Sequence, residues 1–216
     1  YLDWNAYARL ERLYVKLFHQ EADLAVHLIL DASASMGCGE SPPEKKFLLA
    51  RRLAAGLAYA TLANFDRAGL MTLGGRPALT RLPARGRGQV RRLLGLLDEL
   101  SPAGEPDPVR ELSRCAALQR RPGVAILVSD MLDPRLQEGL RVLQHHRHEI
   151  WCLHILSPED RGEGLEGELE LVASESGRTR AVSATPSVLE AYRRNVGEFR
   201  ASLETFCRER RIGRRD

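Results

Sequence analysis

The stretch Val26-His-Leu-Ile-Leu-Asp-Ala-Ser-Ala-Ser-Met-Gly37 is the part of the sequence that decides the fold. A mostly apolar run ends abruptly in Asp31, Ser33 and Ser35, as expected where a buried strand opens into a loop. In open α/β sheets, ligands bind outside the carboxyl ends of the strands. One carboxylate and two hydroxyls supply only oxygen ligands, which suit Mg²⁺ or Mn²⁺ rather than zinc. The alternative is a plain loop in which Asp31 caps a helix and the serines bond neighbouring backbone groups.

The remaining periodicity predicts a doubly wound, mostly parallel α/β sheet. Apolar residues at helical spacing alternate with short apolar runs, which is typical of parallel sheets covered by helices. Gly74 and Gly75 favour a tight turn into an antiparallel partner strand. Asp133 and Pro134 are typical of a helix start. The predicted strands, besides the first, are 69–73, 77–82, 124–128 and 149–156, and the predicted helices cover 47–65, 90–100, 108–120 and a segment from 134.

The composition favours one compact domain. The chain has 216 residues, a formal charge of +3, and neither an internal repeat nor a low-complexity stretch. Lysine occurs only at 16, 45 and 46, and we expect the arginine-rich basic content to reflect genome composition rather than a partner. No run approaches the roughly 20 apolar residues of a membrane span, and no signal peptide is visible. We expect 1–22 to be the tail of a truncated N-terminal segment, 23–184 to be the main domain, and 185–212 to be its C-terminal amphipathic helix.

Other candidate sites are weaker. The cysteines at 38, 115, 152 and 207 form no Cys-x-x-Cys pair, so free thiols in a reducing, cytoplasmic compartment fit best. A catalytic Cys38 lacks a neighbouring histidine. The histidines at 145, 146 and 148 are typical of a solvated helix end, and the basic stretch 85–92 has no interleaved aromatic residues. No P-loop or dinucleotide-binding glycine pattern follows any strand.

The C-terminal segment predicts a long amphipathic helix that starts at Thr185 and Pro186. Large apolar residues repeat along it at spacings of four and three, and such a stripe must be buried against something. We expect it to dock on the sheet of its own domain. The alternative is a coiled-coil-like seam with a partner helix or a second copy. The residues of the stripe are Tyr192, Val196, Phe199, Leu203 and Phe206.

The motif Leu28-Ile-Leu-Asp-Ala-Ser-Ala-Ser-Met36, a helix from about residue 45, and the segments 65–70 and 126–130 follow in the order of a von Willebrand factor A-type domain. More closely, the chain resembles the bacterial domain-of-unknown-function family 58, which carries such a domain. The segments that carry this resemblance include Leu2-Asp-Trp-Asn-Ala-Tyr-Ala-Arg9 and Val128-Ser-Asp-Met-Leu-Asp-Pro134. Further matches lie at 13–18, 154–159, 168–172 and 175–177, and in a tail around Tyr192, so the resemblance covers nearly the whole chain.

The resemblance implies a metal-ion-dependent adhesion site. In that family, Asp-x-Ser-x-Ser is the first limb of the site. Ser33 and Ser35 match the direct hydroxyl ligands, and Asp31 matches the carboxylate that holds the ion directly or through water. Asp130 matches the aspartate of the second loop. The implied cofactor is Mg²⁺ or Mn²⁺, weakly bound.

One ligand of the family set is missing here. A threonine from an intervening loop completes the adhesion site, but Pro106 stands in its place and has no side-chain oxygen. Asp107 could substitute, although a role as the helix cap before Pro108 is equally compatible with the sequence. Because Mg²⁺ readily keeps its waters, the remaining oxygens could still hold it.

The resemblance implies a non-catalytic protein-interaction module. An acidic side chain of a partner protein would fill the open coordination position of the ion. The family also implies a MoxR-type AAA+ ATPase as partner, in complex assembly or chaperone-like action. The alternative is a Mg-dependent phosphohydrolase with Asp31 as nucleophile, but that chemistry needs a second carboxylate where this sequence has Ser33.

Overall fold

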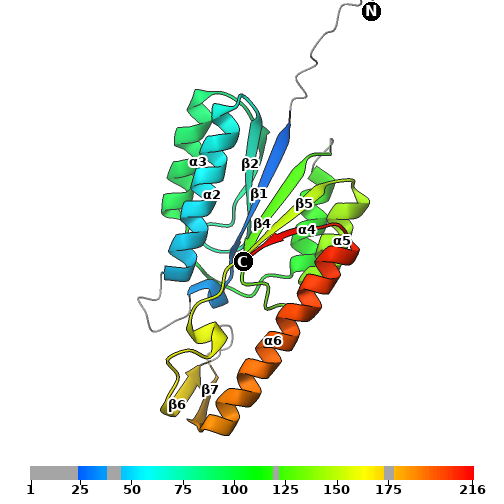
Figure 1. Ribbon diagram of the computed structural model, residues 1–216. Helices are drawn as coiled ribbons and strands as arrows, with labels where there is room; N and C mark the ends of the chain where they lie inside the picture. The colour runs from blue at the N-terminus through cyan, green and yellow to red at the C-terminus, as the bar shows by residue number, and fades with distance from the viewer. Residues whose placement is uncertain (1–23, 38–44, 119–121, 173–177) are drawn as a thin grey trace, which may run out of the picture.

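The computed structural model describes residues 24–37, 45–118, 122–172 and 178–216 (Figure 1). Its centre is a six-stranded sheet with the order β3-β2-β1-β4-β5-β8. All neighbouring strands are parallel except β2 and β3, which pair antiparallel. The predicted doubly wound, mostly parallel α/β fold is therefore confirmed. The strands are β1 (Ala25–Ala32), β2 (Arg67–Gly74), β3 (Thr80–Ala84), β4 (Val124–Ser129), β5 (Glu149–His154) and β8 (Gly213–Arg215).

Helices cover both faces of this sheet (Figure 1). On one face lie α2 (Lys45–Ala63) and α3 (Arg87–Glu99), and on the other lie α4 (Pro108–Leu118), α5 (Leu136–His145) and the end of α6 (Pro186–Glu209). Side chains of β1 alternate between the two cores, since Leu28 and Leu30 belong to the first and Ile29 to the second. A strand that is buried on both faces reads as a continuous apolar run, as the sequence does.

Small residues let α2 approach the sheet closely. The alanines of α2 at 50, 54 and 58 lie on one face of the helix, at helical spacing, and are buried in the first core. Across the sheet from α2, the second core is built from longer side chains of β4, α4 and α5, such as Leu127, Leu112 and Leu140.

One strand and one helix begin two or three residues later in the structure than the sequence predicts. The turn at Gly74 and Gly75, with φ of 68° and 84°, is confirmed, but β3 begins at Thr80 rather than at residue 77. Asp133 Oδ1 accepts the backbone N–H of Arg135 at 2.8 Å, yet α5 begins only at Leu136. The first turn closes by a bond from Leu136 N to Asp133 O, so the helix proper starts after it.

The C-terminal helix docks on the domain with its second half only. Leu203 and Phe206 are buried in the second core, whereas Val196 and Phe199 are partly buried and Tyr192 is 39% exposed. The expectation that the whole stripe is buried was wrong for Tyr192. The first half of α6 extends past the sheet beside a separate hairpin of β6 (Gly167–Val172) and β7 (Thr179–Ala184) (Figure 1).

The strand β8 was not predicted. After α6 the chain turns back, buries Ile212, and adds three residues alongside β5. Two short 3₁₀ helices, η1 (Ala34–Gly37) and η2 (Glu159–Arg161), follow β1 and β5 at the carboxyl edge of the sheet. Among the described helices, none is both long and apolar enough to cross a membrane.

Candidate metal centre

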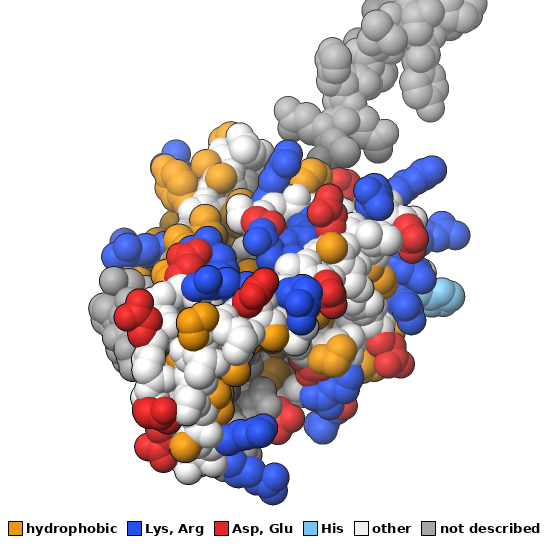
Figure 2. All heavy atoms as spheres, turned by 60° about the horizontal axis from the view of Figure 1, so that its bottom comes forward, with side chains coloured by type: hydrophobic (Ala, Val, Ile, Leu, Met, Phe, Trp, Pro, Cys, Tyr) orange, Lys and Arg blue, Asp and Glu red, His pale blue; other side chains and the backbone are white. Residues whose placement is uncertain are grey.

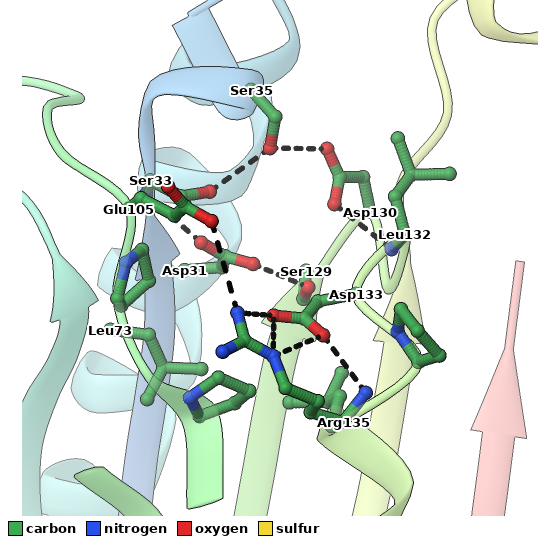
Figure 3. A pocket seen from close by; sticks show the side chains of 14 residues that line it. Asp31, Ser33, Ser35, Leu73, Glu105, Ser129, Asp130, Leu132, Asp133 and Arg135 are labelled. Atoms are coloured by element: carbon green, nitrogen blue, oxygen red, sulfur yellow. Dashed lines mark hydrogen bonds and ion pairs between the residues drawn. The ribbon is translucent and has the colours of Figure 1, made fainter. Parts of the chain in front are cut away.

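The edge where β1 and β4 end brings together four of the five predicted ligands. These strands are parallel neighbours with Leu30 paired to Val128, so the residues that follow them emerge side by side. The loop after β1 supplies two serines and the loop after β4 supplies an aspartate. All four side chains line one pocket of about 390 Å³ (Figure 3). They are Asp31, Ser33, Ser35 and Asp130.

Hydrogen bonds link the two loops (Figure 3). Asp31 Oδ1 accepts the backbone N–H of Ser33 at 2.9 Å. The hydroxyls of Ser33 and Ser35 lie 3.0 Å apart, and Ser35 Oγ donates to Asp130 Oδ2 at 3.0 Å. These spacings place hydroxyl and carboxylate oxygens of both loops within reach of one small cation.

Ser129 is a positioning residue that the sequence did not single out. Its hydroxyl donates to Asp31 Oδ2 at 2.6 Å and accepts the backbone N–H of Met131 at 2.8 Å. Ser129 is fully buried at the end of β4. It therefore fixes the Asp31 carboxylate against the loop that carries Asp130. The available signal was a single hydroxyl at the end of an otherwise apolar strand.

Lys46 is the second residue that sequence reasoning missed. Its ammonium donates to Asp130 Oδ2 and to Asp160 Oδ2, each at 3.0 Å. Burial acts to lower the pKa of Lys46, but the charges of Asp130 and Asp160 outweigh it, so the pKa of Lys46 is raised and the side chain stays charged. A fixed internal cation thus lies beside the predicted ligands.

The electrostatics of the pocket favour a bound cation. Burial raises the pKa of Asp31, and the charge of Asp130 raises it further, against the hydrogen bonds from Ser129 and Ser33. A cation between the two carboxylates would relieve this repulsion. Among the described residues, no group of three or more His, Cys, Asp or Glu side chains could hold a metal, so an ion at this edge depends on the two serine hydroxyls. This oxygen set fits Mg²⁺ or Mn²⁺.

The fifth predicted ligand, Asp107, does not join the other four. Its Oδ1 accepts the backbone N–H groups of Val109 and Arg110 at 3.1 and 3.2 Å, so it caps the start of α4. The pocket is lined instead by the two residues before it, Glu105 and Pro106. Glu105 is the one oxygen-bearing side chain that this loop turns towards the pocket (Figure 3).

The other candidate residues lie away from this pocket. His145 and His146 are at the end of α5, as expected of a solvated helix end, whereas His148 packs against His27. The basic stretch 85–92 includes the exposed start of α3. Cys38 lies outside the described residues. Seen from the carboxyl edge of the strands, basic and acidic side chains are interspersed, and neither sign forms a continuous field (Figure 2).

Comparison with known sequences gives one family and several relatives. A family model described as "Protein of unknown function DUF58" matches residues 1–202. "Uncharacterized protein Mb1516" of Mycobacterium bovis and "Uncharacterized protein Rv1480" of Mycobacterium tuberculosis are each 30% identical to the chain over 212 residues. These matches cover 96% of this chain but 66% of the relatives, so the chain spans just under two thirds of their length.

Two solved structures superpose on the chain with TM-scores above 0.5 and share its type of fold. An aerotolerance-related membrane protein from Bacteroides fragilis superposes with a TM-score of 0.53 at 15% identity, covering 81% of this chain and 88% of that one. BatB from Bacteroides thetaiotaomicron gives 0.51 at 16% identity, covering 81% and 87%. The VWA domain of SpRpn10 gives 0.45 at 16% identity, covering 62% and 75%. At these identities the likeness concerns the fold alone.

Proposed function

The chain belongs to the DUF58 family, and from this premise we propose that its edge site is a metal-assisted protein-interaction site without chemistry of its own. One observation carries the proposal. Hydroxyls from the loop after β1 and a carboxylate from the loop after β4 are joined by hydrogen bonds of 3.0 Å at the mouth of an open pocket. This is the arrangement that the resemblance to von Willebrand factor A-type domains implies.

In this proposal Mg²⁺ or Mn²⁺ binds to Ser33 and Ser35 directly, with Asp31 and Asp130 as direct or water-bridged partners. Glu105 lines the pocket, whereas Asp107 is committed to capping α4. The Glu105 carboxylate lies 4.0 Å from the Arg135 guanidinium and does not group with Asp31 and Asp130, so it takes the place of the family's threonine through a bridging water rather than as a direct ligand. The ion keeps several waters. Its affinity is modest, because Lys46 already neutralises part of the charge of Asp130.

The partner in this proposal is a protein that offers an acidic side chain to the open coordination position of the ion. Apolar residues such as Leu73, Leu132 and Leu136 surround the oxygens, so they would pack against the stem of the acidic side chain. The family resemblance points to a MoxR-type AAA+ ATPase, with the chain acting in complex assembly or in chaperone-like work.

A phosphohydrolase with Asp31 as nucleophile is the less favoured function. Both Asp31 oxygens already accept hydrogen bonds, from Ser33 N at 2.9 Å and from Ser129 Oγ at 2.6 Å, and the side chain is buried. Position 33 also has no carboxylate to act as acid and base. The two functions are separated by an aryl phosphate assay with Mg²⁺, in which the interaction module is expected to show no turnover.

The proposal is tested by binding of the purified chain to the MoxR-type ATPase of the same organism. Because the ATPase itself uses Mg²⁺, the metal site is removed by mutation rather than by chelation. The double variant Ser33→Ala, Ser35→Ala is expected to lose binding, whereas Ser202→Ala, an exposed serine of α6, keeps it. Equal binding by both variants would contradict the proposal.

A further inference from the structure

Among the residues that the structure describes, none of the helices covers the α2 side of the sheet at β5 and β8. α2 contacts β1, β2 and β4, and α3 packs against α2. Within the described part of the chain, the outer strands β5 and β8 have no helix over them on this side. Trp151 of β5 is 38% exposed there, and Gly213 of β8 lies directly beneath its ring. A single exposed aromatic residue is ordinary, but one that lies beside further exposed apolar side chains belongs to a patch of the kind that marks interaction sites.

This open face continues into an apolar groove. Leu153 lies on the same side of β5 as Trp151, since side chains alternate along a strand. Across from it, Leu49 and Leu53 project from one face of α2 and are 49% and 38% exposed. Together with Leu156 they form the walls of a pocket of about 350 Å³ that is distinct from the candidate metal centre.

The rim of this groove is basic. Arg161, Arg200 and Arg215 line it together with one acidic residue, Asp216. The carboxylate of Asp216 lies 2.6 Å from the guanidinium groups of both Arg200 and Arg214. The arginines at the rim can therefore bind a carboxylate. These two arginines also keep a buried Nε that has no hydrogen-bond partner within the described residues. Arg161 is paired with Glu163, whereas Arg215 has no ion pair in the described part of the chain.

We infer that this groove is a docking site for a short acidic segment of a partner protein that carries apolar side chains. Leucine-type side chains would lie against Leu49, Leu53 and Leu153, and carboxylates would reach Arg215 and the neighbouring arginines. The apolar walls select a peptide over a nucleic acid, and the basic rim selects acidic over basic peptides. This site acts independently of the metal centre.

The test uses a short synthetic peptide of glutamates with two leucines four positions apart, and a control peptide with lysines in place of the glutamates. The protein carries Trp4→Phe, so that Trp151 is its sole tryptophan and reports on the groove by fluorescence. The acidic peptide is expected to change the Trp151 emission saturably. Arg215→Glu is expected to weaken its binding by about tenfold or more, because an attractive charge becomes repulsive. The matched control Arg92→Glu, on α3 far from the groove, leaves the affinity unchanged.

Two further arms complete the test. Leu53→Glu is expected to remove binding of the acidic peptide, and Arg215→Glu is expected to improve binding of the lysine peptide. The inference is overturned if the acidic peptide causes no saturable change, or if both peptides bind alike. It is equally overturned if Arg92→Glu weakens binding as much as Arg215→Glu. Two other results would assign the groove to another occupant and overturn the inference. In both, the acidic peptide fails to bind. The protein instead binds anionic lipid vesicles or forms a concentration-dependent dimer, and Arg215→Glu abolishes that binding or that dimer.

Discussion

Lys46 and Asp130 form a buried ion pair at the centre of the candidate site. Lys46 Nζ lies 3.0 Å from Asp130 Oδ2, and the two side chains are 2% and 3% exposed. The same ammonium bonds Asp160, whose backbone oxygen accepts the hydroxyl of Tyr192 from α6. One lysine therefore connects the predicted metal ligands to η2 and to the projecting half of the last helix. It also competes with any divalent ion for the charge of Asp130.

Removal of the positive charge of Lys46 is expected to destabilise the fold and to strengthen metal binding. Lys46→Met leaves Asp130 buried without its partner, and breaking a buried pair on one side typically costs about 3–5 kcal/mol. Mg²⁺ can then neutralise Asp130, so part of the loss should be recovered when Mg²⁺ is added. Urea unfolding with and without Mg²⁺ measures both effects. A loss that Mg²⁺ does not reduce would show that the ion does not reach Asp130.

Substitutions at Glu105 and at Asp107 are expected to have different effects, the first on metal binding and the second on helix capping. Glu105→Gln removes a charge at the pocket and should lower the affinity for Mg²⁺ with little change in stability. Asp107→Ala removes the cap of α4 and should cost about 1 kcal/mol of stability without changing the affinity for Mg²⁺. Calorimetric titration and urea unfolding of both variants are the measurements. The reverse pattern would return the ligand role to Asp107.

The last helix is expected to be anchored by its C-terminal half. Phe206 is buried in the second core with Arg141 and Arg210 against its ring, so Phe206→Ala should cost roughly 3–5 kcal/mol. Phe199 is only partly buried, and Phe199→Ala should cost clearly less. Thermal unfolding gives the two losses, and sedimentation gives the oligomeric state. A Phe206→Ala chain with an unchanged melting temperature but a changed sedimentation coefficient would mean that α6 packs against a partner or a second copy.

His27 is expected to make the protein less stable in acid. It is buried in β1 with its ring edge against His148, and its Nε2 has no hydrogen-bond partner within the described residues. Burial, and then the neighbouring His148, lower the pKa of His27 from 6.5 to about 4. His27 becomes protonated near pH 6.5 in the unfolded chain but only near pH 4 in the folded chain. The free energy of unfolding therefore keeps its full value above pH 6.5 and decreases as the pH falls from 6.5 towards 4.

The loss due to His27 amounts to about 2 kcal/mol between pH 7 and pH 5. Urea unfolding of the wild type and of His27→Leu at both pH values isolates it, since other groups contribute equally to the two proteins. The variant should lose less stability than the wild type over this interval. An identical loss in both proteins would rule out His27 as a source of acid sensitivity.

The sequence predicted the fold, and it predicted that Asp31, Ser33, Ser35 and Asp130 lie together, because these signals are local. An apolar strand that ends in Asp31 and two serines, and a second that ends at Asp130, each show their role within a few residues. Parallel pairing of β1 and β4 then suffices to bring them together. The positioning role of Ser129 was not predicted, because a single hydroxyl at the end of a strand has many ordinary roles.

Other features depend on contacts that no local pattern records. Lys46 and Asp160 meet across 114 positions of the chain, and neither stands in a recognisable motif. β8 consists of Gly213, Arg214 and Arg215, which have no preference for a strand, and forms only because the edge of β5 is available. The apolar stripe of α6 is continuous in sequence, but the sheet beneath it ends halfway along. Helical periodicity shows which residues share a face and says nothing of how far the opposing surface extends.

The central claim, a divalent-metal site built from two loops, is tested most directly by the melting temperature with and without Mg²⁺. The comparison is between the wild type and the double variant Ser33→Ala, Ser35→Ala. Mg²⁺ should raise the melting temperature of the wild type, because an ion that binds only the folded chain stabilises it by mass action. The double variant should unfold close to the wild type in chelator and should show no rise with Mg²⁺. Equal rises in the two proteins would contradict the assignment of the site.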